Sequence, residues 1–165
     1  MVPILLGLGT NLGDRAANLR RAVAWLGGVA TVDAVSAVFE TAPMYDTDQA
    51  SFFNICATAR THLAAGDLLP RLKAAEAEIG RVPSRRNGPR LIDIDLVLYG
   101  DQVIDTPDLV VPHPRMAERG FVLAPAAEVA GAWRHPVLGR SVADLLQALG
   151  PLDGVTRRGE LDTIP

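Results

Sequence analysis

Residues 86–99 have the sequence Arg-Asn-Gly-Pro-Arg-Leu-Ile-Asp-Ile-Asp-Leu-Val-Leu-Tyr. An apolar, β-branched run after a Gly-Pro turn predicts a β-strand. Because successive side chains of a strand point to opposite faces, Asp93 and Asp95 share one face. The other face takes Ile92, Ile94, Leu96 and Leu98. The stretch therefore predicts a half-buried strand that presents two carboxylates side by side.

The acidic pair on this strand favours a cation. The carboxylates of Asp93 and Asp95 each raise the free-energy cost of ionising the other unless a positive charge lies between them. Hard divalent ions prefer oxygen ligands, and Mg²⁺ is the first choice where a phosphate completes the coordination. The pattern therefore favours a magnesium and phosphate site, and the alternative is a solvated strand face that carries two acids.

Arginines are concentrated just before the acidic pair. The ten residues 81–90 hold Arg81, Arg85, Arg86 and Arg90 and no acid. A guanidinium group pairs bidentately with phosphate, and a metal beside an arginine clamp suits phosphoryl transfer. A solubilising loop is the alternative. Strand parity would turn Arg90 away from the aspartates, so we expect Arg90 to lie in the turn and to curl back.

A second candidate phosphate site lies at residues 112–119, Pro-His-Pro-Arg-Met-Ala-Glu-Arg. Two prolines restrict the backbone around His113, so its ring is presented at a low cost in conformational entropy. Arg115 and Arg119 are spaced to share a helical face. His113 would donate to a phosphate oxygen, and the alternative is a histidine that caps a turn.

A candidate site for a flat ligand begins at Phe52-Phe53-Asn54. Adjacent rings on a strand face opposite ways, so one packs inward and the other points outward. The outward ring, with Asn54 and Phe121, would stack on and hydrogen-bond a flat heterocycle. The alternative is that both rings belong to the core.

Composition narrows the class of protein. The 165 residues are 48% hydrophobic and 21% charged, which predicts one globular domain over 1–165. The formal net charge of −3 argues against a protein that binds nucleic acid in general, and no apolar stretch approaches the length of a membrane helix. With Cys56 as the single cysteine and no basic leader at the N-terminus, we expect a cytoplasmic protein. A monomer is the expected state, although no sequence feature determines it.

Hydrophobic periodicity predicts the order strand, helix, strand, strand, helix, strand, which is that of an antiparallel split βαβ unit with two helices on one face. The opposite face is expected to be partly open or covered by loops. The expected strands are 2–9, 29–40, 52–63 and the acidic run, with a hairpin partner at 102–105. The expected helices are 15–27, one capped by Asp67 that runs to Ile79, short pieces within 115–130, and 141–149. Residues 151–165 are predicted to be a loosely held tail.

These residues resemble a known family. Residues 88–96, Gly-Pro-Arg-Leu-Ile-Asp-Ile-Asp-Leu, together with residues 112–116, Arg119 and Phe121, resemble the 6-hydroxymethyl-7,8-dihydropterin pyrophosphokinases of folate biosynthesis. Residues 7–14 resemble the opening of the same family, so the resemblance covers nearly the whole chain. It implies a ferredoxin-like α+β fold with a C-terminal extension.

The resemblance also implies an activity, which is transfer of pyrophosphate from ATP to the hydroxymethyl oxygen of the pterin, with release of AMP. Two Mg²⁺ ions would be held by Asp93 and Asp95, which with Arg81 and Arg90 are the expected catalytic residues. The expected contacts to ATP and its phosphates are Lys73, Glu76, Arg81, Arg90, His113, Arg115 and Arg119. The expected pterin contacts are Thr41, Pro43, Met44, Phe52, Asn54, Asp93 and Phe121.

The chain departs from the family pattern at two positions. Some members have Trp at the place of Asn87, so closure of the loop would use other contacts, and some have Tyr at the place of Phe52, so a hydroxyl contact would be lost. Two other functions remain open. One is a nucleotidyltransferase or phosphohydrolase with the same metal pair, and the other is a non-catalytic pterin-binding module.

Overall fold

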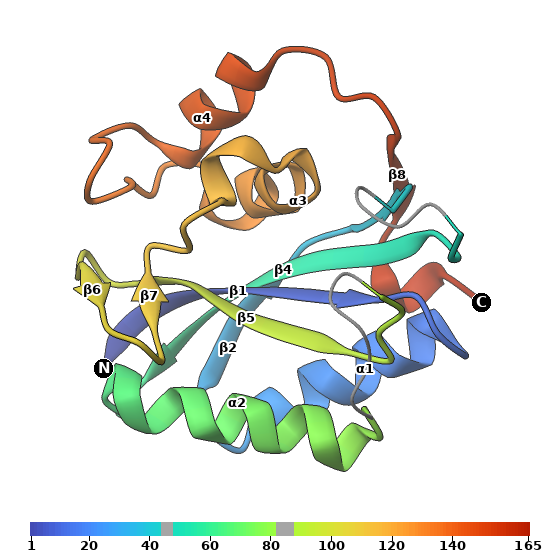
Figure 1. Cartoon of the computed structure of the whole chain (residues 1–165), viewed down its shortest axis with the longest axis horizontal. Coiled ribbons are helices and arrows are strands. Elements are labelled where there is room, and N and C mark those ends of the chain that lie inside the picture. Colours follow the sequence, from blue (N-terminus) through green and yellow to red (C-terminus); the bar gives the residue numbers. More distant parts are fainter. Residues whose placement is uncertain (44–47, 82–87) are drawn as a thin grey trace.

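An antiparallel sheet forms the centre of the computed structural model, which describes residues 1–43, 48–81 and 88–165 (Figure 1). Its strand order is β5-β1-β4-β3-β8, with β2 also paired to β4. The strands are β1 (Val2–Thr10), β2 (Thr31–Val35), β3 (Val38–Thr41), β4 (Phe52–Thr61), β5 (Asp93–Tyr99), β6 (Ile104–Asp105), β7 (Val110–Val111) and β8 (Val155–Gly159). The helices are α1 (Arg15–Leu26), α2 (Ala65–Ile79), α3 (Gly120–Ala130) and α4 (Val142–Leu149), with 3₁₀ turns η1 (Met116–Glu118) and η2 (Leu161–Thr163). The expected α+β class is confirmed.

Helices lie on both faces of the sheet. Figure 1 shows α1 and α2 together on one side and α3 and α4 on the other. The larger core lies beneath α1 and α2, and a smaller cluster lies under α3 and α4. The expectation of a second face that is partly open or covered by loops is only partly met. The apolar residues of 116–130 fold into helices that bury Leu123 and Ala126 against the sheet, and the face is open where a pocket lies.

Two predicted helix starts have different outcomes. α4 begins as expected, because the Ser141 side chain accepts a hydrogen bond from the Asp144 N–H. α2 begins earlier than expected, with Ala64 rather than Asp67 as its N-cap residue. The Ala64 carbonyl already accepts the N–H groups of Asp67 and Leu68, so Asp67 lies in the first turn, where its charge favours the helix dipole.

The predicted strand 29–40 is broken in two at Ser36. The Ser36 hydroxyl accepts the Cys56 N–H at 2.9 Å and donates to the Ala37 carbonyl at 2.8 Å, so a side chain takes part in the ladder. The Ala37 N–H then donates to Glu128 of α3 at 2.9 Å. These long-range contacts separate β2 from β3.

The hairpin partner predicted for the acidic strand is also wrong. The predicted segment 102–105 contains β6, but β6 pairs with β7 in a separate two-stranded sheet and leaves β5 at an edge of the main sheet. A bulge at Val97 further corrects the predicted face of Leu98, because it shifts the register on β1 from Leu6↔Leu96 to Leu5↔Leu98. Leu98 thus joins the cluster under α3 and α4.

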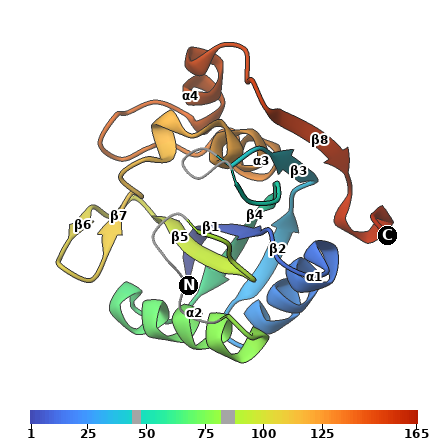
Figure 2. The ribbon, with the colours of Figure 1, turned by 45° about the vertical axis from the view of Figure 1, so that its right-hand side comes forward.

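The predicted loose tail at 151–165 is ordered in the structure. Residues 155–159 form β8, which pairs with β3 and supplies partners for backbone groups that would otherwise lie at a sheet edge (Figure 2). Leu161 follows in η2, only 7% exposed within the larger core. Arg20 of α1 donates to the carbonyls of Leu161, at 2.7 Å, and Ile164. The mixed charge, Gly and Pro composition of this segment conceals these contacts.

Substitution Leu161→Ala tests whether the tail contributes to stability. Because Leu161 is buried, we expect its truncation to lower the free energy of unfolding by about 2–4 kcal/mol. Urea denaturation followed by circular dichroism measures this change. Stability equal to that of the unsubstituted chain would show that residues 151–165 are held loosely after all.

Candidate active site

A pocket lies on the face of the sheet away from α1 and α2, bordered by α3 and by the end of β3. Its floor includes two glycines of the interior strand β1, Gly7 and Gly9. Gly9 pairs with Asn54 of β4 and Asp93 of β5, whereas Gly7 pairs with Cys56 and Asp95. Because β1 has no side chain at these positions, the floor is open between the acidic groups of β5 and the polar groups of β4.

The acidic pair lies at the β5 side of the pocket. Asp93 and Asp95 both line it, as their spacing predicts. The Asp93 carboxylate lies 2.7 Å from the Arg81 guanidinium and 3.9 Å from Nε of Arg90. Burial raises the pKa of Asp95, and the negative charge of Asp93 raises it further, whereas Lys73, Arg119 and Arg81 act in the opposite direction. A cation bound between the carboxylates would remove this repulsion.

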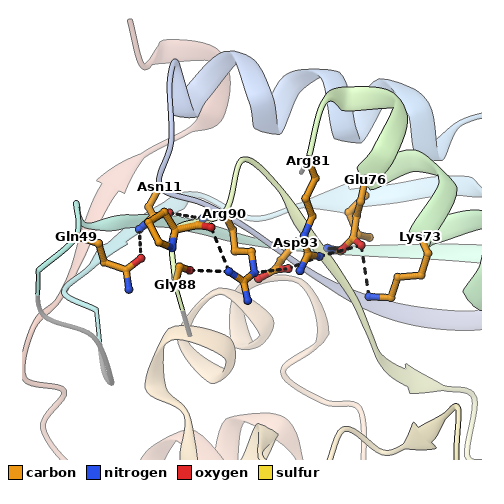
Figure 3. A network of polar contacts seen from close by, with 10 residues as sticks. Asn11, Gln49, Lys73, Glu76, Arg81, Gly88, Arg90 and Asp93 are labelled. Carbon is orange, nitrogen blue, oxygen red and sulfur yellow. Dashed lines mark hydrogen bonds and ion pairs between the residues drawn. The ribbon is translucent and has the colours of Figure 1, made fainter. Parts of the chain in front are cut away.

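Glu76 of α2 contacts the backbone of β5 between the two residues of the acidic pair. It is 3% exposed on α2, and its carboxylate accepts the N–H of Ile94 at 2.7 Å on the open edge of β5. The same carboxylate lies 3.0 Å from Arg81 and 3.5 Å from Lys73 (Figure 3). Burial raises the pKa of Glu76, although the Ile94 N–H lowers it. Lys73 and Glu76, which are predicted ATP contacts, thus lie outside the pocket lining, and of the two only Glu76 contacts and orients Arg81.

Arg90 occupies the turn before β5, which confirms its expected place. Its guanidinium donates to the carbonyls of Gly88 and Pro89, at 2.9 and 3.1 Å, and it lines the pocket. The N–H of Arg90 donates to the side-chain oxygen of Asn11 at 2.8 Å, and the Asn11 N–H donates back to the Arg90 carbonyl at 2.9 Å. The turn is therefore fixed to the end of β1.

Asn11 also holds the opposite side of the pocket. Its amide nitrogen donates to the Gln49 side chain at 2.8 Å and to the Ala50 carbonyl at 2.9 Å (Figure 3). One buried side chain thus joins residues 49–50 to Arg90. Sequence reasoning assigns Asn11 no role of its own, although its place in the Gly-rich opening at 7–14 is a usable signal.

The third side of the pocket combines aromatic and amide groups. Phe52 and Phe121 line it, while Phe53 points into the core beneath Arg15, which confirms that the adjacent rings face opposite ways. The Asn54 amide nitrogen donates to Oγ1 of Thr41 at 2.8 Å. This bond fixes the orientation of Asn54 and leaves its oxygen, Oδ1, directed over Gly9.

His113 and Arg119 reach the pocket from the chain after β7, whereas Arg115 does not line it. Arg115 is exposed and lies 3.9 Å from Glu118. The Nδ1 atom of His113 accepts the Arg115 N–H at 3.2 Å, so the ring hydrogen is on Nε2. Burial lowers the pKa of His113, and the charges of Arg119 and Arg115 lower it further, so the ring is neutral near pH 7.

The remaining predicted site residues have different outcomes. Pro43 lines the pocket, as expected. Met44 and Asn87, with Arg85 and Arg86 of the basic loop, lie outside the described residues. Within the described residues, Asp93 and Asp95 belong to no cluster of three or more His, Cys, Asp or Glu side chains placed to hold a metal.

The fold and the pocket define an α+β protein that can hold a polyphosphate beside a flat heterocycle. The family model for 7,8-dihydro-6-hydroxymethylpterin-pyrophosphokinase (HPPK) matches residues 5–131, and the chain belongs to this family. The resemblance in the sequence is thereby confirmed.

Curated relatives agree with this assignment. The chain is 45% identical over 126 residues to the 2-amino-4-hydroxy-6-hydroxymethyldihydropteridine pyrophosphokinase of Bacillus subtilis, covering 75% of each protein. It is 40% identical over 135 residues to the folic acid synthesis protein FOL1 of Dictyostelium discoideum, covering 82% of this chain. The chain spans only 20% of that longer relative.

Solved structures confirm the fold. The Plasmodium falciparum HPPK-DHPS crystallised with pteroate matches with a TM-score of 0.75 at 13% identity, over 94% of this chain and 47% of that one. Across the described part of the chain, no helix has both the length and the apolar character to cross a bilayer.

The raised pKa of Asp95 predicts a dependence of stability on pH. When folding raises the pKa of a carboxyl group, that group destabilises the folded state at pH values above the raised pKa. The destabilisation disappears as the pH falls toward the ordinary pKa of 3.8. In the presence of a metal chelator and in the absence of ligands, the Asp95→Asn variant should therefore have a higher melting temperature than the unsubstituted chain at pH 7.5. The difference should shrink toward pH 4.

Thermal denaturation at several pH values measures this difference. Asp105→Asn, a change at an exposed acid of β6, is the matched control and should leave the melting temperature unchanged. A lower melting temperature for Asp95→Asn at pH 7.5 would contradict the electrostatic conflict assigned to the pair.

Proposed function

We propose that the protein transfers pyrophosphate from ATP to the hydroxymethyl group of 6-hydroxymethyl-7,8-dihydropterin in a magnesium-dependent reaction of folate biosynthesis. One observation carries the proposal. The acidic pair of β5 and the aromatic and amide groups around Asn54 line one pocket, separated by the glycines of β1. A phosphate chain at the first group would therefore lie next to a heterocycle at the second, as transfer between them requires.

Magnesium fits the acidic side of the pocket. Asp93 and Asp95 offer carboxylate oxygens, which Mg²⁺ prefers, and their mutual repulsion favours a divalent cation. Two Mg²⁺ ions bound by these groups and by phosphate would neutralise charge on the phosphate chain and hold it in position. Family membership supports the assignment of Asp93 and Asp95 as the ligands.

Cationic residues in the pocket lining and beside it suit the phosphate chain. Arg90 and Arg119 line the pocket, whereas Arg81 contacts Asp93 from outside the lining. Arg81 is held by Glu76 and Asp93, and Arg90 is held by its own turn, so both groups are oriented in advance. Their fixed positive charges would stabilise negative charge that develops during transfer. His113 would donate from Nε2 to a phosphate oxygen, with Arg119 beside it on the same side of the pocket.

The aromatic and amide groups suit the pterin. A flat ring between Phe52 and Phe121 would stack on their faces, and Oδ1 of Asn54 would accept from an amino group on the ring edge. Thr41 and Pro43 line the same end of the pocket. Because Phe52 has no hydroxyl, this side chain contributes stacking alone.

The reaction joins the hydroxymethyl oxygen to the β-phosphorus of ATP and breaks the bond between that phosphorus and the oxygen that leaves with AMP. The hydroxyl proton must leave as the new bond forms. Asp95 is our hypothesis for its acceptor, because its carboxylate lines the pocket that would hold both substrates.

A product assay tests the proposed reaction. With ATP, Mg²⁺ and the reduced pterin, we expect AMP and the pterin diphosphate in equal amounts, measured by chromatography. ADP or inorganic phosphate as the product would reject the proposal in favour of another phosphotransferase or a phosphohydrolase. Pterin binding without any turnover would instead support a non-catalytic module.

Substitution Asp95→Ala tests the acidic pair. We expect kcat to fall about 1000-fold or more, because the group is proposed to act in the transition state. The fold should remain intact, because the change removes a repulsion. Asp105→Ala, at an exposed acid of β6, is the matched control and should retain full activity. Near-normal turnover of Asp95→Ala would contradict the metal assignment.

Substitution Gly9→Ala tests the floor of the pocket. A Cβ on Gly9 would lie 2.8 Å from Oδ1 of Asn54 and would force the amide away from its bond to Thr41. We expect the Kd for 6-hydroxymethylpterin to rise about tenfold or more, since a small displacement of a contact group is costly. Fluorescence titration measures this Kd.

Substitution Gly66→Ala is the matched control for the glycine change, because a Cβ there meets no other atom within 4 Å. Its pterin Kd should equal that of the unsubstituted chain. Unchanged pterin binding by Gly9→Ala would place the heterocycle elsewhere.

A further inference from the structure

The segment 152–158, here called the C-terminal bracket, contacts both walls that border the aromatic end of the pocket. One wall is the start of α3, which carries Phe121, and the other is the end of β3, which carries Thr41 and Pro43. Figure 2 shows β8 running beside β3, with α3 close to both. The bracket lies beyond the residues 5–131 that match the family model.

The bracket packs directly on α3. A Cβ built on Gly120 would lie 2.8 Å from a terminal carbon of Leu152, so the leucine side chain rests against the backbone next to Phe121. Leu152 and Val155 also pack with Phe39 of β3 and Ala124 of α3 in one apolar cluster. The bracket thereby fills the space between the helix and the strand.

An ion pair provides a second link to α3. Nε of Arg157 lies 2.8 Å from Glu128, whose other oxygen accepts the Ala37 N–H at 2.9 Å. Glu128 thus joins α3 to β8 and to the break between β2 and β3. The position of α3 over the sheet depends on this residue as well as on apolar packing.

Backbone contacts link the bracket to the other wall. Val155 pairs with Thr41, and the Ala42 N–H donates to the Gly154 carbonyl at 3.2 Å. Gly154 has a φ of +73°, a conformation that favours glycine, so this close approach is specific to that residue. Since Thr41 orients Asn54, the bracket contacts the strand that sets the amide of the pocket.

We propose that the C-terminal bracket is a positioning element for the heterocycle. It fixes the separation between Phe121 on one wall and Thr41 to Pro43 on the other, and so determines pterin affinity. The inference rests on the proposed function and goes beyond it. The acidic pair and Arg90 lie on the opposite side of the pocket, on β5 and the turn before it, and only Arg119 of the proposed phosphate contacts adjoins α3. Nucleotide affinity should therefore depend on the bracket less than pterin affinity does.

The test compares two leucines of the same C-terminal segment. Leu152→Ala removes the packing between the two walls, and Leu161→Ala removes packing in the core beneath α1 and α2. We expect Leu152→Ala to raise the Kd and KM for the pterin about tenfold, with kcat within about twofold, because a wall moves while the reacting groups stay in place. The Kd for a non-hydrolysable ATP analogue with Mg²⁺ should rise less than the pterin Kd does, because Asp93, Asp95 and Arg90 stay in place.

Control variants separate positioning from stability. Leu161→Ala should destabilise the protein and leave pterin affinity unchanged. Arg157→Gln should weaken pterin binding, Arg157→Lys should restore part of it, and Arg60→Gln, which breaks the exposed Arg60 to Asp33 pair, should have no effect. Unchanged pterin affinity in Leu152→Ala, or an equal loss in Leu161→Ala, would overturn the proposal.

Amide hydrogen exchange of the ligand-free protein gives a readout that does not need pterin binding. Leu152→Ala should accelerate exchange at Ala42 and at Val122 and Leu123 more than Leu161→Ala does. Equal exchange rates at these amides in the two variants would overturn the proposed positioning role of the bracket. Failure of the unsubstituted chain to bind pterin, with the exchange difference present, would instead reject the proposed function and keep the structural role.

Discussion

Two like charges held on one face of an edge strand are the constraint on which the site depends. Asp93 and Asp95 are held in place because β5 is paired to β1, an interior strand that also pairs with β4. With strands spaced at about 4.8 Å, the acidic pair and Asn54 are separated by two strand spacings, or about 10 Å. The sheet thus fixes the distance between the two ends of the pocket, and glycine at the two intervening positions keeps the space open.

Local patterns predict most of the elements, and long-range contacts account for most of the differences. The helix predicted at 15–27 and the strand predicted at 52–63 agree closely with α1 and β4, because periodicity and caps lie within each segment. The break at Ser36 depends on Cys56 and Glu128, which are distant in sequence. The order of the C-terminal segment depends likewise on the unpaired edge of β3.

The residues of the candidate site also divide into those that the local sequence marks and those whose role depends on long-range contacts. Asp93, Arg90, His113 and Phe121 carry their chemistry in their own side chains and neighbours, so the sequence can mark them, and the structure places all four around one pocket. The role of Asn11 depends on partners 38 to 79 residues away, so the Gly-rich opening at 7–14 can mark the residue but does not reveal its contacts. The open floor depends on strand register, since a glycine matters there only when its neighbours across the sheet are known.

The carboxylate of Glu76 has a consequence for the chain's behaviour in concentrated solution. An edge strand normally exposes N–H groups that can template pairing with another molecule. The Glu76 carboxylate accepts the outward N–H of Ile94, the second residue of β5, between the two aspartates. The Glu76 side chain of α2 therefore occupies a backbone donor that could otherwise pair with a strand of another molecule. This contact disfavours self-association through the β5 edge and leaves the sequence of the strand that carries the acidic pair unchanged.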